Sequence, residues 1–211
     1  SFETMILKSK ICGVSDSKIL NYITNHDHPP QFIGFIVNYP KSKRYVSLEN
    51  LKELLKIEKK NSLYVGVLVS PNDNILEEIK NLPFDYYQLY DVSPEKTKKI
   101  KFKYKIKIIS AITVSGQHDV IKFKDYLKIS DIILFDSTGY HKSKSFDHSL
   151  LDKVPNELNK MIAGNIQIND ISSFKNKDFI IDLSGGLEDK NGKKDIDKID
   201  IFLKTVHNTN S

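Results

Sequence analysis

Residues 32–69 read FIGFIVNYPKSKRYVSLENLKELLKIEKKNSLYVGVLV, and this stretch decides the fold. It opens and closes on short apolar runs, residues 32–37 and 63–69, whose β-branched character is typical of strands covered on both faces. Between the runs, Ser47 can cap a helix that carries three leucines on one face. A strand, a helix and a second strand in this order predict a parallel βαβ unit.

The same alternation continues along the rest of the chain. Further helix starts are predicted at Ser15, at Ser93 followed by Pro94, and at Asp195. Eight strand-then-helix units predict an α/β fold, a single eight-stranded parallel (β/α)8 TIM barrel. An open doubly wound sheet is the alternative, although no Gly-x-Gly-x-x-Gly follows the first strand. The other predicted strands span residues 6–12, 86–90, 105–111, 132–135, 160–163 and 179–183.

Length and composition agree with one globular domain. The chain has 211 residues, 39% of them hydrophobic and 28% charged, which excludes collagen and strongly charged disordered proteins. We expect one domain over residues 1–211, with residues 1–4 as a remnant foreign to the natural protein. The single cysteine, Cys12, excludes a disulfide framework and a cysteine-rich zinc site. With neither a signal peptide nor a membrane span in the sequence, we expect a cytoplasmic protein with no membrane partner.

The net charge of +5 permits nucleic acid, an acidic membrane surface or an anionic substrate as a partner. Residues 96–107 read KTKKIKFKYKIK, and interleaved aromatic residues can stack on nucleic-acid bases. A solvated helix end that runs into a strand is the favoured interpretation, so we expect no nucleic-acid partner. Arg44 is the only arginine among 32 basic residues. Its planar guanidinium can grip a carboxylate or a phosphate, or it can be an ordinary surface residue.

The active site of a (β/α)8 barrel lies at the carboxyl ends of the strands. Cys12 ends the first strand and is either a small buried hydrophobe or a base or nucleophile. Asp136 ends the sixth strand and is either a loop cap or a general acid. These strands are three apart in a ring of eight, so the two side chains can face one another across the mouth of the barrel.

Two small-residue turns follow the last two strands. They are Ala163-Gly164-Asn165 and Ser184-Gly185-Gly186. Loops seven and eight form the usual phosphate site of these barrels, because small residues leave backbone N–H groups open. Ordinary tight turns are the alternative, but two such turns at both expected positions favour phosphate.

Several motifs resemble those of phosphoribosylanthranilate isomerase, in order over nearly the whole chain. They are KICGV from Lys10, GFI from Gly34, YPKSKRYVS from Tyr39, VGVLV from Val65, Asp136-Ser137, SFD from Ser145, DLSGGLE from Asp182 and GKKD from Gly192. The resemblance implies a (β/α)8 barrel that carries out an Amadori rearrangement of N-(5-phosphoribosyl)anthranilate in tryptophan biosynthesis.

The resemblance also implies roles for individual residues. Cys12 is then the general base that removes the C2 proton, and Asp136 is the general acid that protonates the ribose ring oxygen. Arg44 binds the anthranilate carboxylate, and Asp182 has a supporting polar role at the substrate. Four small residues hold the phosphate, namely Ala163, Gly164, Ser184 and Gly185. The resemblance implies no metal and no organic cofactor, a small phosphorylated substrate, and a monomer rather than a dimer.

The chain departs from the family pattern in its loops. A glycine-rich loop after the sixth strand is replaced by Tyr140-His141-Lys142-Ser143, and the aromatic residue after Phe146-Asp147 is His148. The usual Gln-Leu-His-Gly is Gln88-Leu89-Tyr90-Asp91, and the usual Gly-Gly-Leu is Ala163-Gly164-Asn165. Loss of glycine restricts the conformations open to a lid.

Three hypotheses for function therefore stand side by side. The first is a working phosphoribosylanthranilate isomerase whose loops have changed. The second is an isomerase of another phosphoribosylamine, because the bulk and charge of residues 140–142 suit a different substrate. The third is a degenerate barrel that only binds phosphate or a partner, and the joint presence of Cys12, Arg44 and Asp136 argues against it.

Overall fold

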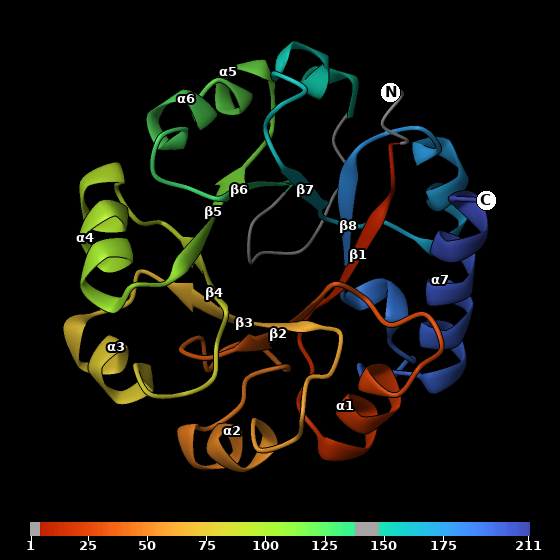
Figure 1. The fold of residues 1–211 in the computed structure, drawn as a ribbon, viewed down its shortest axis with the longest axis horizontal. Helices are drawn as coiled ribbons and strands as arrows, with labels where there is room; N and C mark the ends of the chain where they lie inside the picture. The colour runs from red at the N-terminus through yellow and green to blue at the C-terminus, as the bar shows by residue number, and fades with distance from the viewer. Residues whose placement is uncertain (1–4, 138–147) are drawn as a thin grey trace.

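The eight predicted strands are present, and they close into a parallel barrel in which each strand pairs with the next and β8 pairs with β1 (Figure 1). The computed structural model describes residues 5–137 and 148–211. The (β/α)8 prediction is therefore confirmed, and the open-sheet alternative is wrong. The strands are β1 (Lys8–Ile11), β2 (Phe32–Ile36), β3 (Leu63–Val69), β4 (Tyr86–Tyr90), β5 (Lys107–Thr113), β6 (Ile132–Asp136), β7 (Lys160–Ala163) and β8 (Phe179–Leu183).

Helices surround the barrel and cover the outer face of its sheet (Figure 1). The units after β6 and β7 carry short 3-10 helices where the earlier units carry α-helices. Among the residues that the structure describes, none of the helices has the length and apolar character of a membrane span. The helices are α1 (Ser17–Thr24), α2 (Leu48–Leu54), α3 (Asp73–Ile79), α4 (Pro94–Tyr104), α5 (Gln117–Val120), α6 (Phe123–Tyr126), η1 (His148–Lys153), η2 (Ile168–Phe174), η3 (Gly185–Leu187) and α7 (Ile196–Thr209).

Three of the four predicted helix caps are confirmed. The side chains of Ser47, Ser93 and Asp195 each accept hydrogen bonds from the first turn of α2, α4 and α7. The prediction of Ser15 is wrong, because the carboxylate of Asp16 accepts from the Ile19 backbone at 2.9 Å and caps α1. An aspartate one residue further on competes for the same backbone donors and is at least as good a cap.

The largest strand error concerns β5, which was predicted to begin at Lys105. That residue instead ends α4 in the left-handed conformation, with φ of 49°, and β5 begins at Lys107 and runs on to Thr113. The lysine-rich segment 96–107 is thus a helix end followed by a strand, and Phe102 within it is 64% exposed. Smaller errors affect three other strands. β1 begins at Lys8 rather than at residue 6 and ends one residue early, β2 also ends one residue early, and β6 extends to Asp136.

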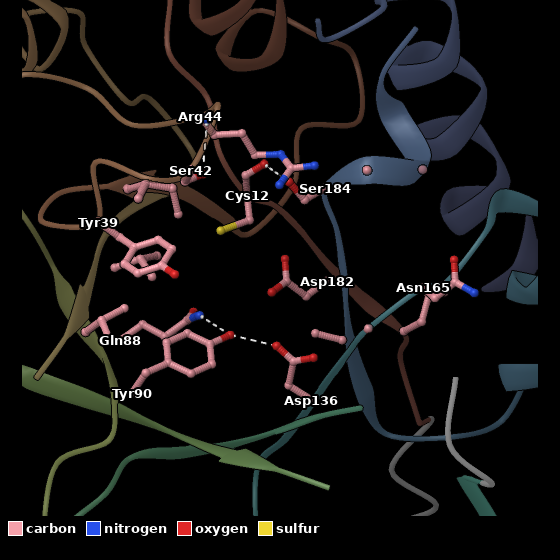
Figure 2. Close-up of a pocket in the computed structure, with 18 of the residues that line it drawn as sticks. Cys12, Tyr39, Ser42, Arg44, Gln88, Tyr90, Asp136, Asn165, Asp182 and Ser184 are labelled. Atoms are coloured by element: carbon pink, nitrogen blue, oxygen red, sulfur yellow. Dashed lines mark hydrogen bonds between the residues drawn. The ribbon is translucent and has the colours of Figure 1, made fainter. Parts of the chain in front are cut away.

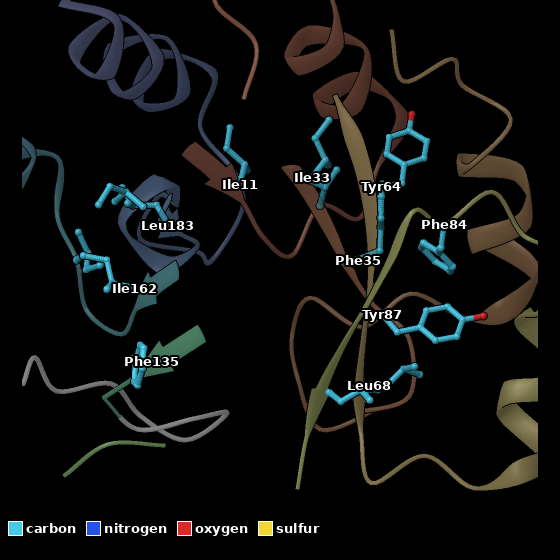
Figure 3. Packing of buried hydrophobic residues seen from close by; sticks show 14 of the residues in the cluster. Ile11, Ile33, Phe35, Tyr64, Leu68, Phe84, Tyr87, Phe135, Ile162 and Leu183 are labelled. Carbon is cyan, nitrogen blue, oxygen red and sulfur yellow. The ribbon is translucent and has the colours of Figure 1, made fainter. Parts of the chain in front are cut away.

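Apolar side chains pack on both faces of the sheet. Outward-facing residues such as Ile33, Phe35 and Leu68 pack against the helices (Figure 3). A second cluster that includes Val65, Leu134 and further strand residues fills the barrel interior. Burial on both faces explains why the strands read as nearly continuous apolar runs. The interior becomes polar only toward the carboxyl ends of the strands, where the next section places the site.

Candidate active site

A cavity of about 410 Å³ opens at the carboxyl ends of the strands (Figure 2). Every site residue predicted from the sequence lines it. Its lining consists of Cys12, Ile36, Tyr39, Ser42, Arg44, Val67, Val69, Gln88, Tyr90, Asp136, Ala163, Gly164, Asn165, Ile166, Gln167, Asp182, Ser184, Gly185 and Gly186.

Cys12 follows the last residue of β1 and is 8% exposed. Gly34 on β2 leaves room for it, because a Cβ built on that glycine would lie 2.8 Å from Cys12 Sγ. Burial raises the pKa of the Cys12 thiol, the neighbouring Lys10 opposes this rise, and Asp182 adds to it. Together these effects raise the pKa of Cys12 above its ordinary value, so the thiol form is favoured at neutral pH and the share of thiolate grows as the pH rises.

Lys10 is fully buried inside the barrel, two residues before Cys12. Its ammonium donates to Asp182 Oδ2 at 3.1 Å, in keeping with a strand register that pairs Lys10 of β1 with Asp182 of β8. Burial by itself lowers the pKa of Lys10, but the charges of Asp182 and Cys12 outweigh that effect and raise it. Lys10 is therefore a permanent cation beside Asp182, which lines the cavity.

Asp136 ends β6 and is 4% exposed. The hydroxyl of Tyr90 donates to Asp136 Oδ2 at 2.8 Å, and Gln88 Nε2 lies 3.5 Å from the same hydroxyl. Burial, and then the charge of Asp136, raises the pKa of Tyr90 well above its ordinary value, so this hydroxyl stays protonated and remains a donor. Figure 2 shows Cys12 and Asp136 on different sides of the cavity, with Asp182 between them.

Arg44 reaches the rim from the loop after β2. Its Nε and Nη2 donate to the two carboxylate oxygens of Glu188 at 2.6 Å each, in a bidentate pair. Gly13, with φ of +80°, makes this path possible, since a Cβ there would lie 2.4 Å from Arg44 Cδ. Lys194 also contacts Glu188, at 2.5 Å. The lone arginine is therefore a carboxylate-gripping residue at the cavity, rather than an isolated surface side chain.

The two small-residue turns lie together on the rim, as predicted. Gly164 has φ of +100°, and a Cβ there would lie 2.0 Å from Ser137 Oγ and 2.9 Å from Asp136 Oδ1. Ser184 Oγ donates to the backbone oxygen of Cys12 at 2.9 Å and lies 3.2 Å from Lys194 Nζ. This side of the cavity thus combines open backbone with a buried ammonium, which suits an anionic group.

Two buried oxygen atoms of the lining have no hydrogen-bond partner among the described residues. They are Gln88 Oε1 and Asp182 Oδ1. Burying such an acceptor without a donor is costly, so these atoms are suited to a ligand that brings hydroxyl or N–H groups. Within residues 5–137 and 148–211, no group of three or more His, Cys, Asp or Glu side chains could hold a metal ion.

Sequence reasoning assigns no role to four residues around the cavity, namely Lys10, Tyr90, Glu188 and Lys194. Lys10 belongs to the KICGV motif but sits within an apolar strand. Tyr90 closes the fourth apolar run, where site residues are expected, but nothing in the sequence gives it a task. Glu188 and Lys194 give no signal of their own in the sequence. Glu188 pairs with Arg44, which lies 144 residues away along the chain, and Lys194 pairs with Glu188 across a loop. Residues 140–143 and the motif at 145–147 lie outside the described residues.

Comparison with known proteins gives one consistent answer. A family model described as N-(5'phosphoribosyl)anthranilate (PRA) isomerase matches residues 9–205. The N-(5'-phosphoribosyl)anthranilate isomerase of Sulfurihydrogenibium sp. (strain YO3AOP1) is 31% identical over 206 residues, which cover 94% of this chain and 98% of the relative.

Solved structures agree with the sequence comparison. Phosphoribosyl anthranilate isomerase from Thermotoga maritima superposes with a TM-score of 0.84 at 25% identity, over 96% of this chain and 100% of that chain. A phosphoribosyl anthranilate isomerase in complex with reduced 1-(o-carboxyphenylamino)-1-deoxyribulose 5-phosphate has a TM-score of 0.82 at 26% identity, with the same coverage. The family match over residues 9–205, on a barrel whose mouth holds Cys12, Asp136 and the two small-residue turns, shows that this chain belongs to the N-(5'-phosphoribosyl)anthranilate isomerase family.

Proposed function

We propose that the chain catalyses the Amadori rearrangement of N-(5'-phosphoribosyl)anthranilate to 1-(o-carboxyphenylamino)-1-deoxyribulose 5-phosphate, a step of tryptophan biosynthesis. One observation carries the proposal: a buried thiol and a buried carboxyl group, Cys12 and Asp136, line one cavity. A related isomerase holds the reduced form of this product. The chemistry needs one proton donor and one proton acceptor on a substrate anchored at its charged ends.

The rim binds the charged ends of the substrate. The phosphate lies against the turns at Ala163-Gly164 and Ser184-Gly185, where the buried ammonium of Lys194 adds positive charge beside Ser184. The anthranilate carboxylate lies against Arg44, whose guanidinium offers further donors beyond those given to Glu188. These two contacts leave the ribose over the cavity floor, between the acid and the base.

Asp136 is the general acid of the first step. Its proton goes to the ribose ring oxygen, the bond between that oxygen and C1 breaks, and the nitrogen lone pair forms an iminium at C1. The hydrogen bond from Tyr90 fixes one carboxyl oxygen of Asp136 while the other acts. A positioned carboxyl group of this kind contributes about 10²–10⁴-fold to a rate.

Cys12 is the general base of the second step. The C2 proton moves to Sγ, and the electron pair of the C2–H bond forms a C1=C2 double bond that neutralises the iminium. The resulting enol takes up a proton at C1 and loses the proton of its C2 hydroxyl, which yields the ketone. Asp182 Oδ1 and Gln88 Oε1 can accept hydrogen bonds from the substrate N–H and hydroxyl groups during these transfers.

The test is turnover of freshly prepared phosphoribosylanthranilate, followed as loss of anthranilate-type fluorescence. We expect turnover, and we expect a second phosphoribosylamine substrate to compete poorly. Preference for that second substrate would favour the related isomerase with altered specificity. A folded protein that turns over neither substrate would contradict the proposal and favour a barrel that only binds phosphate or a partner.

We further propose that the chain acts in the cytoplasm and as a monomer. A dimeric phosphoribosylanthranilate isomerase is known from Thermotoga maritima, so the assembly state needs its own measurement. Sedimentation equilibrium is expected to give the mass of one chain, and a concentration-independent dimer would contradict this proposal.

A further inference from the structure

Lys10 is a buried charge that the mechanism above leaves unused. Its side chain is completely inaccessible, and its ammonium is paired with Asp182 at 3.1 Å. Burying an ammonium and a carboxylate costs several kcal/mol per ion, and an apolar pair of similar volume is often as stable. The interior of this barrel is otherwise filled largely by apolar residues such as Val65 and Leu134. A purely structural role therefore explains the buried Lys10–Asp182 pair poorly, and a role at the neighbouring site explains this pair better.

The ammonium of Lys10 lies close to the sulfur of Cys12. A Cβ built on Gly34 would be 2.8 Å from Cys12 Sγ and 3.3 Å from Lys10 Nζ, so both atoms border the same small gap. Their separation cannot exceed the sum of those two distances, which places them within the roughly 4–6 Å over which an opposite charge favours ionisation. The absence of a side chain at Gly34 is what lets the two groups share this space.

We propose that Lys10 is a positioning residue for the base: its fixed positive charge stabilises the thiolate of Cys12 that removes the C2 proton, and Asp182 holds it in place. The inference rests on the proposed function, in which Cys12 is the base. When the C2 proton moves to Sγ, the S–H bond forms and the C2–H bond breaks, while Lys10 neither gains nor loses a proton. The lysine acts on the sulfur and does not touch the substrate's reacting atoms.

Other charged groups also face the sulfur, and their effects differ in sign. Burial raises the pKa of the Cys12 thiol most, Lys10 is the strongest of the influences that lower it, and Asp182 raises it. Lys194, on the loop after η3, also lowers the pKa of Cys12. Arg44 on the loop after β2 and Tyr90 on β4 interact electrostatically with the same sulfur, whose charge raises the pKa of each. Lys10 is the cation in this set that is both fully buried and next to the sulfur.

The test uses the fact that Cys12 is the only cysteine in the chain. Alkylation by iodoacetamide therefore reports on one thiolate, and its rate against pH gives the midpoint of ionisation without any need for activity. In Lys10→Met we expect the midpoint to rise by at least about one pH unit, a tenfold fall in rate at any pH below both midpoints. In Asp182→Asn, where the lysine keeps its charge, we expect the midpoint to fall.

A matched control separates this effect from the general loss of a buried lysine. Lys160 on β7 is also buried, but its ammonium contacts the backbone oxygens of Pro155 and Leu158. Lys160→Met is therefore expected to leave the midpoint of Cys12 in place. An unchanged midpoint in folded Lys10→Met, or equal shifts in Lys10→Met and Lys160→Met, would overturn the proposal.

Two further measurements give the midpoint of Cys12 where the first variant or the reagent fails. If Lys10→Met does not fold, Lys10→Met combined with Asp182→Asn removes both charges, and its midpoint must lie above that of Asp182→Asn alone. If the reagent cannot reach the sulfur, the ultraviolet absorbance of the thiolate, taken as wild type minus Cys12→Ala, gives the same midpoint. If the variants show these shifts while the wild type shows no isomerase turnover, the proposed function is refuted and the Lys10–Cys12 coupling stands.

Discussion

The hydroxyl of Tyr90 on β4 donates a 2.8 Å hydrogen bond to Asp136 Oδ2 on β6, across the intervening strand β5. Both side chains are buried. The small residue Ala111 of β5 packs against the cluster in the barrel interior that includes Tyr90. The family pattern has histidine at the position of Tyr90. A tyrosine here keeps its proton over the whole working pH range, since burial raises its pKa well above the ordinary value. The proposed acid is thus held by a donor that does not itself titrate.

Tyr90→Phe removes this donor and leaves the carboxyl oxygen without that partner. Asp136 becomes a carboxylate as it gives up its proton, and a hydrogen bond to a charged group is worth about 1.5–3 kcal/mol. We therefore expect kcat to fall by about 10–100-fold, with KM little changed. Steady-state kinetics on phosphoribosylanthranilate measure the effect. Tyr86→Phe is the matched control, because Tyr86 lies on the inner face of the same strand, away from Asp136. Equal kinetics in the two variants would show that the hydrogen bond has no catalytic role.

Gly164→Ala is expected to damage both the fold and the site. Its Cβ would lie 2.0 Å from Ser137 Oγ and 2.9 Å from Asp136 Oδ1, and φ of +100° strains any L side chain. We expect the free energy of unfolding to fall by more than about 1 kcal/mol, and the remaining folded enzyme to lose activity. Urea unfolding and kinetics test this. Gly116→Ala, where the new Cβ meets only a histidine ring at 3.4 Å or more, should change neither quantity much.

Glu188→Gln is expected to lower stability in a pH-dependent way. Burial alone would raise the pKa of Glu188, but hydrogen bonds from Arg44 and the charge of Lys194 bring it below its ordinary value. A lowered folded-state pKa stabilises the protein above the unfolded pKa, and that stability is lost as the pH falls through the folded pKa. We expect a gap of about 1–3 kcal/mol between wild type and variant at neutral pH, narrowing below about pH 4.

Urea midpoints at a series of pH values measure this gap. Glu53→Gln is the control, because its carboxylate pairs with Lys56 on the surface, with both side chains 70% exposed. Exposed pairs of this kind contribute little, so that variant should follow the wild type at every pH. A gap that stays constant from neutral to acidic pH would mean that the ion pair with Arg44 does not account for the stability.

Much of the fold was predictable because the chain repeats one physical pattern. Apolar runs such as residues 63–69 must be buried on both faces, and their regular spacing leaves room for one crossover helix each. Cys12 and Asp136 were predictable for a related reason: a polar side chain that closes a buried strand must emerge at the mouth of the barrel. Residue-level boundaries were less predictable, since Ser15 and Asp16 compete for the same backbone donors.

The long-range pairs around the cavity could not be predicted in the same way. Lys10 is a single charged residue within a short apolar strand, and only the closure of β1 against β8 places its ammonium beside Asp182. The Arg44–Glu188 pair likewise depends on two loops that meet only once the barrel is closed. Sequence periodicity reports the face of an element on which a residue lies, whereas these contacts depend on the three-dimensional path of separate loops.

The central claim, that Cys12 and Asp136 are the base and the acid of one isomerisation, is tested most directly by turnover in Cys12→Ala and Asp136→Asn beside the wild type. Circular dichroism and urea midpoints must first show that each variant is folded. The account predicts that the rate falls by at least about 10²–10⁴-fold in each variant, while the wild type consumes phosphoribosylanthranilate. A folded Cys12→Ala protein that turns over the substrate at the wild-type rate would contradict it.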